Sequence, residues 1–171
     1  MLLFAGMQVA VSAEYERKFS VTSLKEIRER AVVMQQWDNS CAAAALATVL
    51  TYGLADPVSE RYVAARMLET TDARKVKTQG GFSMLDMKRF VESRGYAVDA
   101  FQHLSTDQLA LFRAPIVPIR PFGSNHYVVV NSITEDVVLL ADPAFGNRSL
   151  TLREFKEMWF NGLAFVIAEG K

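Results

Sequence analysis

The sequence predicts an α+β fold in which a helical N-terminal lobe packs on a mostly antiparallel C-terminal sheet. Apolar residues recur at helical spacing up to about residue 112, and short β-rich runs bounded by turn residues follow. The 171 residues are enough for one domain with its own core, and half of them are hydrophobic. Helices followed by strands are typical of two packed layers.

Capping residues and glycine stops delimit the expected helices. Ser23 stands three residues before a glutamate, and this capping-box spacing opens a short first helix. An Ala- and Leu-rich stretch predicts a buried helix over residues 41–52, with Asn39 or Ser40 as its N-cap and Gly53 as its stop. Further helices are expected over residues 57–68, 83–95, 104–112 and 151–159, and a charged loop over residues 70–79.

The expected strands are short and rich in β-branched residues. Pro121, Gly123 and the acidic turn at 134–136 separate the first three of them. They cover residues 116–119, 127–131, 137–141 and 164–168.

The composition excludes several classes of protein and site. Nineteen Lys and Arg balance nineteen Asp and Glu, which argues against a general nucleic-acid binder. One cysteine excludes an internal disulfide, and two histidines with that cysteine are too few for a zinc site of Cys and His ligands. No apolar run reaches the roughly 20 residues that span a bilayer.

The first thirteen residues are nearly all apolar, and Val11-Ser12-Ala13 at their end has the small-x-small form of a signal-peptidase site. We interpret residues 1–13 as the remnant of a secretory signal peptide, which predicts a periplasmic or secreted protein without a membrane span in its mature chain. The alternative is a buried N-terminal strand or helix. In the oxidising compartment that export implies, the unpaired Cys41 is either a liability to unwanted oxidation or a functional reactive thiol.

Cys41 stands at the first turn of the predicted Ala-rich helix. Backbone N–H groups at a helix start lack intrahelical partners, and the helix dipole is positive there. Both effects favour a thiolate, so Cys41 is a candidate nucleophile. The alternative is a small buried hydrophobic residue, which free cysteines often are.

His126 and Asp142 stand at the two outer ends of a predicted hairpin. His126 opens the strand 127–131, and Asp142 closes the strand 137–141 directly before Pro143. A hairpin places the start of its first strand beside the end of its second, so the two side chains should lie together. A carboxylate in this position fixes the orientation and tautomer of an imidazole. Separately, His126 would be a structural histidine and Asp142 a turn residue before proline.

The chain order of cysteine, histidine and carboxylate is that of papain-type hydrolases, in which cysteine and histidine meet between two lobes. Their oxyanion hole combines the cysteine's backbone N–H with a glutamine side chain shortly before it. Gln35 lies six residues and Gln36 five residues before Cys41.

Three sequence blocks resemble the double-glycine, or bacteriocin-processing, cysteine peptidases. The nucleophile block is QQWDNSCAAAAL from Gln35, the histidine block is GSNHYVVV from Gly123, and the aspartate block is VVLLADPAFG from Val137. The similarity runs from about residue 23 to 168 and includes the region of Trp159. It implies a papain-like peptidase fold over residues 14–171.

The resemblance also implies roles for individual residues. Cys41 would be the nucleophile, His126 the base, Asp142 the orienting residue and Gln35 the oxyanion donor. No cofactor or metal is implied. The family cuts leader peptides after a Gly-Gly pair through a narrow cleft, and the implied partner is a peptide or protein substrate of a secretion system. Two departures are Ala42, where the family usually has glycine, and the lack of a transporter segment, which resembles a stand-alone secreted branch.

Two other functions suit the same scaffold. One is a non-catalytic module that holds a Gly-rich leader or fibre subunit, although a binder has no need of all four site residues. The other is an amidase or acyltransferase.

Several further residues receive structural interpretations. His103, between a strand and a helix cap, is expected at the surface. Gly80 and Gly81 are expected in the loop before the cap Ser83. The stripe of Met84, Met87 and Phe90 predicts core packing. Trp37 either packs or forms the floor of a binding groove.

Overall fold

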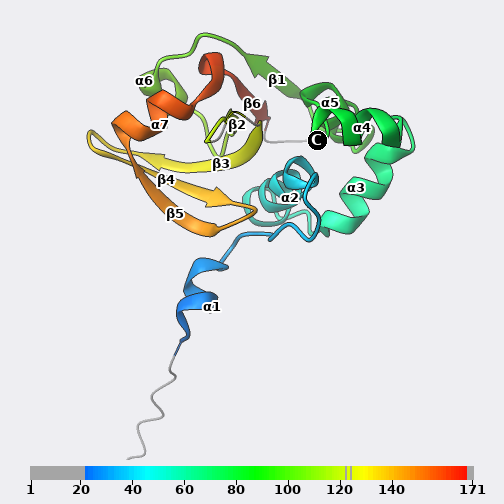
Figure 1. Ribbon diagram of the computed structural model, residues 1–171, viewed down its shortest axis with the longest axis horizontal. Coiled ribbons are helices and arrows are strands. Elements are labelled where there is room, and N and C mark those ends of the chain that lie inside the picture. The colour runs from blue at the N-terminus through cyan, green and yellow to red at the C-terminus, as the bar shows by residue number, and fades with distance from the viewer. Residues whose placement is uncertain (1–21, 122, 124, 169–171) are drawn as a thin grey trace, which may run out of the picture.

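The computed structural model describes residues 22–121, 123 and 125–168. A sheet of six strands occupies one part of it, and helices from the N-terminal half of the chain gather on the other side (Figure 1). The segment 1–13 lies outside the described residues. Within the described ranges, no helix is both long enough and apolar enough to cross a membrane.

The helices and strands follow the predicted order. In chain order they are α1 (Leu24–Arg28), α2 (Cys41–Thr48), the π-helical turn η1 (Val49–Gly53), α3 (Glu60–Leu68), α4 (Ala73–Gln79), α5 (Met84–Ser93), β1 (Val98–Phe101), α6 (Thr106–Leu109), β2 (Ile116–Ile119), β3 (His126–Ile133), β4 (Val137–Asp142), β5 (Gly146–Thr151), α7 (Leu152–Met158), the 3₁₀ turn η2 (Phe160–Gly162) and β6 (Ala164–Ile167). Capping boxes at Ser23, Ser83 and Thr151 open α1, α5 and α7.

The sheet has the strand order β1-β6-β2-β3-β4-β5, and its neighbouring strands are antiparallel. The β3–β4 hairpin pairs Val129 with Ala141 and contains a register shift at Asn131. The shift lies on the far side of these pairs from His126 and Asp142, so the regular alternation of the strands reaches both residues. They therefore project from the same face of the sheet.

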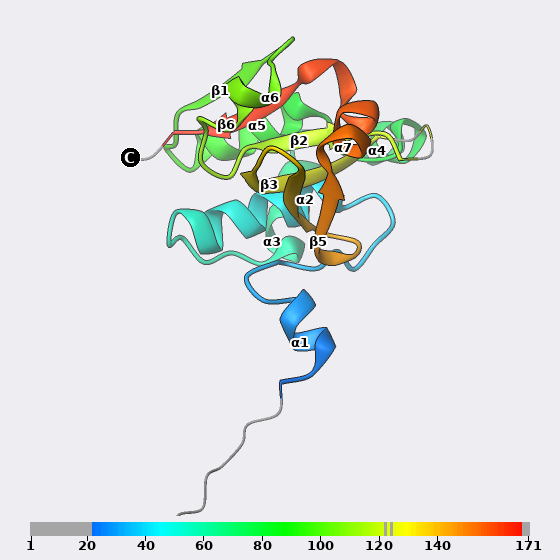
Figure 2. The same ribbon diagram turned by 90° about the vertical axis from the view of Figure 1, so that its left-hand side faces the viewer.

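Two apolar clusters cover the two faces of this sheet. One joins α2, α3 and α5 to Ile116, Val129 and Phe165 on one face. The other joins Phe155 of α7 and Leu109 of α6 to the opposite face. Figure 2 shows α1 below the two layers, where Arg28 at its end lies against Gly146 of β5, and none of its residues is buried.

Helix α2 is the centre of the helical lobe, and all eight of its residues are buried. Its first alanines, Ala42 to Ala45, have no exposed surface. Because alanine ends at Cβ, the backbone of α2 can lie close to the sheet and to α3. This packing holds the start of the helix against the end of the β3–β4 hairpin.

The structure differs from the sequence prediction in two elements. The expected loop 70–79 contains α4, because Asp72 caps it by accepting from the Arg74 N–H and Gly80 ends it with a left-handed backbone. Strand β5 was not expected, since its Gly, Asn, Arg and Ser residues have low β propensity. It forms because it pairs with β4 over the whole length of that strand.

Candidate active site

Cys41 is the first residue of α2, as predicted, and only 5% of it is exposed. Ser40 is its N-cap, but the Ser40 side chain forms no capping hydrogen bond to the helix. The first N–H groups of α2 therefore receive no bond from this side chain. The thiol lies at the positive end of a buried helix dipole.

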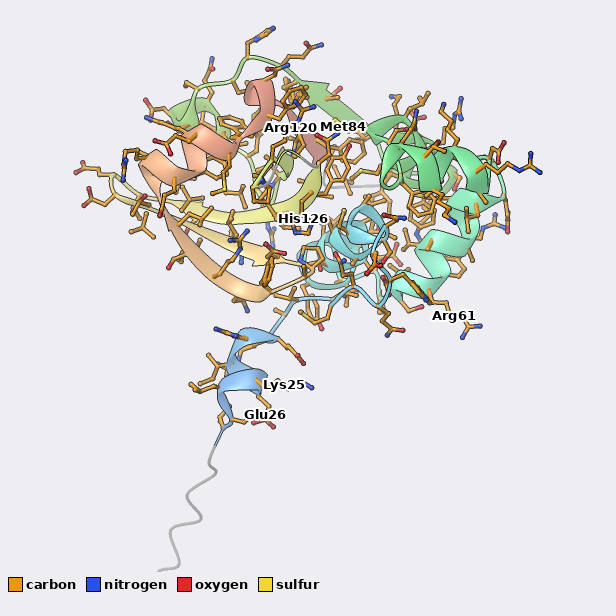
Figure 3. The ribbon with its side chains drawn as sticks, viewed as in Figure 1. Lys25, Glu26, Arg61, Met84, Arg120 and His126 are labelled. Carbon is orange, nitrogen blue, oxygen red and sulfur yellow. The ribbon has the colours of Figure 1, made fainter. Side chains whose placement is uncertain are left out.

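His126 and Asp142 are brought together as the hairpin geometry predicts. The Nε2 atom of His126 lies 2.7 Å from Oδ1 of Asp142. Since an ionised carboxylate only accepts, Nε2 carries the proton in this bond. The remaining ring nitrogen, Nδ1, is then the one available to Cys41, whose interaction with the ring contributes to the raised pKa of His126. Figure 3 shows His126 at the junction between the sheet and α2.

The two ionisable partners of His126 stabilise its charged form. Burial of the ring opposes the charge, but hydrogen bonds to Asp142 and Cys41, with the charges of both groups, raise the pKa of His126 from 6.5 to about 9. Burial likewise disfavours the charge on Asp142, yet the bond from His126 and three smaller contributions hold the pKa of that carboxyl below its ordinary value. The imidazolium form of His126 therefore persists at neutral pH.

Arg148 of β5 is a partner of Asp142 that the sequence analysis did not identify. Its Nε donates to Oδ2 of Asp142 at 2.8 Å, and its Nη2 lies 2.7 Å from the same oxygen. The Ala144 N–H donates to Oδ1 at 2.9 Å. Asp142 has no exposed surface, so Arg148 supplies the positive charge that a buried carboxylate needs. A predicted hairpin at residues 142–146 would have placed Arg148 on the same face as Asp142.

Gln35 and Gln36 occupy different surroundings in the loop before Cys41. The backbone N–H of Gln35 donates to Pro143 O at 2.8 Å, which ties this loop to the turn after Asp142. Its side-chain Nε2 donates to Trp37 O at 3.2 Å, and its Oε1 is buried. Gln36 is exposed, and its backbone N–H donates to Glu60 Oε1 at 2.9 Å. The Gln35 side chain is therefore held within the loop, whereas the Gln36 side chain lies at the surface.

A small cavity of about 350 Å³ lies beside Cys41. Its wall includes Gly80, Gly81, Asn125 and Tyr127. A Cβ on Gly81 would stand 3.2 Å from Asn39 O, and the φ of Gly81 is +142°, so only glycine suits this wall. The predicted loop before Ser83 is thus confirmed, and it also lines the cavity at the thiol.

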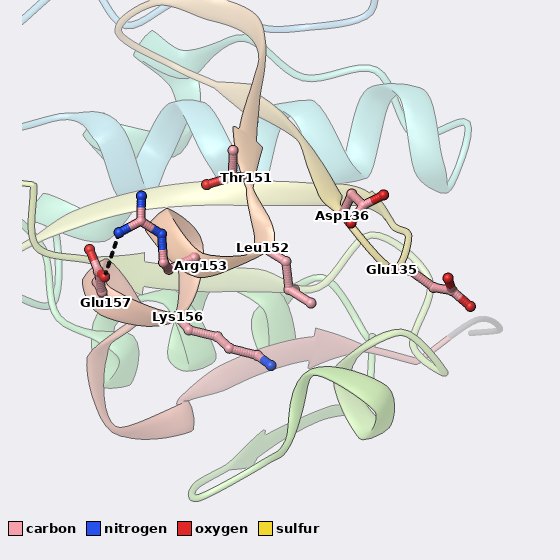
Figure 4. A pocket seen from close by; sticks show the side chains of 7 residues that line it. All are labelled: Glu135, Asp136, Thr151, Leu152, Arg153, Lys156 and Glu157. Atoms are coloured by element: carbon pink, nitrogen blue, oxygen red, sulfur yellow. Dashed lines mark ion pairs between the residues drawn. The ribbon is translucent and has the colours of Figure 1, made fainter.

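Larger hollows lie elsewhere on the surface. Figure 4 shows one of them, between the β3–β4 turn and α7, where Leu152 is surrounded by charged side chains such as Arg153 and Glu157. No residue of the candidate site lines it. Another runs past Phe145 and Arg148.

His103 and the stripe of Met84, Met87 and Phe90 have the structural roles that the sequence predicts. His103 is exposed, as expected, with a left-handed φ of 58°. Met87 and Phe90 are core residues, and Met84 packs against the same cluster. Trp37 is 48% exposed and borders an apolar hollow with Leu68 and Phe82.

Residues 29–171 match the sequence profile of the Peptidase C39 family. The chain belongs to the peptidase C39 family. It is thus a cysteine peptidase by family, and the resemblance noted in the sequence blocks is confirmed.

Two curated relatives of this C39 peptidase are named "Probable functional amyloid protease FapD". The protein from Pseudomonas aeruginosa is 42% identical over 156 residues, covering 88% of this chain and 66% of the relative. The protein from Pseudomonas fluorescens is 38% identical over 179 residues, covering 99% of this chain and 78% of the relative. The chain therefore spans about two thirds to three quarters of these relatives.

Solved structures share the fold of this C39 peptidase. The peptidase domain of Streptococcus ComA, a bifunctional ABC transporter, has a TM-score of 0.68 at 23% identity, covering 81% of this chain and 98% of that domain. A double-glycine motif protease from an AMS/PCAT transporter, solved with its leader peptide, has a TM-score of 0.66 at 22% identity, covering 84% of this chain and 96% of that one. The papain-like fold prediction is confirmed.

Proposed function

We propose that this C39 peptidase cleaves an exported peptide or leader after small residues such as Gly-Gly, with Cys41 as nucleophile. The observation that carries the proposal is the hydrogen bond of His126 to Asp142, in a ring whose pKa is also raised by Cys41 at the start of a buried helix. This arrangement keeps His126 protonated at neutral pH and places it beside the thiol that would act as nucleophile.

In the proposed reaction, the Sγ thiolate of Cys41 attacks the carbonyl carbon of the scissile peptide bond. His126 then gives its Nδ1 proton to the leaving amine as the C–N bond breaks, which leaves a thioester on Cys41. A water molecule next loses a proton to His126 and attacks the thioester, and the acid product and the thiolate–imidazolium pair are restored. Asp142 keeps the ring oriented throughout, because its Oδ1 holds the Nε2 proton.

The negative oxygen of the tetrahedral intermediate needs donors that are already in place. The backbone N–H of Cys41 and the side-chain amide of Gln35 are the proposed pair. The amide has two N–H donors, and one of them is already directed to Trp37 O. That bond fixes the orientation of the amide and leaves the second donor for substrate.

The proposed preference for small residues is supported by the cavity beside the thiol. Its wall is formed in part by Gly80 and Gly81, whose loop lies against Asn39. The phenol of Tyr127 narrows the same cavity, and burial and the neighbouring Cys41 raise the pKa of this phenol to about 12. Tyr127 is therefore a neutral wall at physiological pH.

The names of the relatives suggest the substrate. Because both are called functional amyloid proteases, we propose an exported component of an amyloid-forming system as the substrate of this chain. A periplasmic or secreted location, with residues 1–13 as signal remnant, agrees with such a partner.

The test is cleavage of synthetic peptides that differ only at the two residues before the scissile bond. Wild-type protein should cut a Gly-Gly peptide and leave a Leu-Leu peptide intact, and Cys41→Ala should cut neither. Binding without cleavage by wild-type protein would favour a peptide-binding module. Transfer of the acyl group to an added amine in place of water would favour an acyltransferase.

A further inference from the structure

Glu60 is a buried carboxylate in the helical lobe, and the reaction outlined above does not use it. It is the first residue of α3 and is only 3% exposed. Its Oε1 accepts the backbone N–H of Gln36 at 2.9 Å and contacts the hydroxyl of Ser40. Its Oε2 is buried with no hydrogen-bond partner among the described residues. The carboxylate thus holds both ends of the loop that leads from Gln36 into Cys41.

The contacts of Glu60 continue to the oxyanion donor. The Ser40 hydroxyl lies between Glu60 Oε1 and Trp37 O, at 2.7 Å from the carbonyl oxygen. The same carbonyl accepts the Ser40 N–H and the side-chain amide of Gln35, each at 3.2 Å. Because the Ser40 hydroxyl has one proton and donates it to Glu60, the chain of hydrogen bonds continues through the Ser40 N–H to Trp37 O, which also accepts from Gln35.

This loop has no regular secondary structure, so its N–H groups depend on individual partners. The N–H of Gln35 is bound by Pro143 O from the sheet, and the N–H of Gln36 is bound by Glu60 from α3. The Trp37 N–H donates to the Ser40 hydroxyl at 3.3 Å. Glu60 is thus the contribution of α3 to the shape of this loop, as Pro143 is that of the sheet.

We propose that Glu60 is a positioning residue that sets the oxyanion hole by holding Ser40 and Gln36. The inference rests on the proposed function, since it assigns the oxyanion role to Gln35 and to the Cys41 N–H. Glu60 touches neither the thiol nor the substrate carbonyl in this scheme. Its role is to accept hydrogen bonds through Oε1, and a glutamine can supply the same oxygen.

Two reactions of Cys41 separate this role from a general structural one. Acylation by p-nitrophenyl acetate passes through a tetrahedral oxyanion, forms a thioester and releases p-nitrophenolate. Alkylation by iodoacetamide forms an S–C bond and releases iodide, with no oxyanion. Loss of a positioned oxyanion donor slows only the acylation, whereas a loosened helix start slows both.

The variants are Glu60→Ala, Glu60→Gln and Ser40→Ala. Glu60→Ala and Ser40→Ala should slow acylation by about 10- to 100-fold. The upper value is the rate loss expected when one oxyanion donor is removed. Their alkylation rates should stay within about threefold of wild type, and Glu60→Gln should match wild type in both reactions. Asp56→Ala, which removes the carboxylate that pairs with Arg94 at 2.6 Å in the same lobe, is the control and should alter neither rate.

Equal slowing of both reactions in Glu60→Ala would overturn the proposal, as would an unchanged acylation rate. If Glu60→Ala does not fold, the other two variants still test the proposal. Slower acylation in Glu60→Gln would overturn it, and so would an unchanged acylation rate in Ser40→Ala. The ester also separates this inference from the choice of substrate. Wild-type protein that reacts with the ester but cuts no Gly-Gly peptide would refute the peptide assignment and leave the Glu60 test intact. Wild-type protein with a thiol inert to both reagents would refute both proposals.

Discussion

Asp142→Asn is expected to disable the His126 ring through a conflict with Arg148. In the wild type, Oδ1 of Asp142 accepts from His126 and the Ala144 N–H, while Oδ2 accepts from Arg148. Asparagine has only one oxygen to share between these two sides. The guanidinium of Arg148 only donates hydrogen bonds and cannot accept from the amide N–H₂, so we expect the amide oxygen to turn toward it.

The amide N–H₂ then faces Nε2 of His126 and can only donate to it. The ring must place its proton on Nδ1, the nitrogen that should receive the proton of Cys41. The imidazolium also loses its carboxylate partner. The rise in the pKa of His126 from 6.5 to about 9 corresponds to roughly 3 kcal/mol, shared between Asp142 and Cys41. Losing most of it lowers kcat/KM by about 10²-fold, and the wrong tautomer extends the loss toward about 10⁴-fold.

The assay is the pH dependence of kcat/KM on a cleavable peptide, with wild type, Asp142→Asn, and Asp142→Asn combined with Arg148→Met. The alkaline limb of the wild type should lie near pH 9, where His126 loses its proton, and should move toward neutral pH in Asp142→Asn. Removing Arg148 frees the amide oxygen to turn back to His126. The double variant should therefore recover about tenfold over Asp142→Asn alone, a coupling typical of neighbouring groups.

Two results would refute this reasoning. Wild-type turnover in Asp142→Asn would show that Asp142 is only the turn residue before Pro143. A further loss in the double variant would show that Arg148 does not compete with His126 for the amide oxygen.

The oxyanion glutamine, the glycine wall of the cavity and the charge of His126 each allow a further test. Gln35→Ala should lower kcat by about 100-fold or more with little change in KM, while Gln36→Ala should stay near wild type; the reverse order in steady-state kinetics would reassign the oxyanion donor. Gly81→Ala should abolish cleavage of a Gly-Gly peptide and lower the melting temperature, because its Cβ meets a carbonyl oxygen at 3.2 Å; an active and equally stable variant contradicts this. The raised pKa of His126 stabilises the fold fully below about pH 6.5, and this contribution disappears as the pH rises through about 9. Urea unfolding of the wild type at pH 6 and pH 9.5 should show a loss that is absent in His126→Gln.

Much of this protein can be predicted from local sequence. Several helices begin at a serine or threonine that is followed three residues later by an acidic side chain. Ser23, Ser83 and Thr151 all cap helices in this way. That His126 and Asp142 stand at the same end of the hairpin is also local, but the register shift at Asn131 decides that they share a face of the sheet. The buried, Ala-rich character of α2 similarly follows from its composition.

Other features depend on contacts between segments far apart in the chain. Strand β5 has weak β propensity and exists because β4 offers it a complete row of partners. Arg148 reaches Asp142 only once β5 has paired.

Glu60 shows the same limit more sharply. In the sequence it is an ordinary acidic residue in the first turn of a helix, where the dipole favours negative charge. Only the packing of α3 against α2 buries it beneath Ser40 and Gln36. The proposed catalytic residues could thus be predicted from the sequence. Arg148 and Glu60, which hold them in place, could not, because a buried polar group takes its partner from whichever segment lies next to it in space. Tertiary packing decides which segment that is.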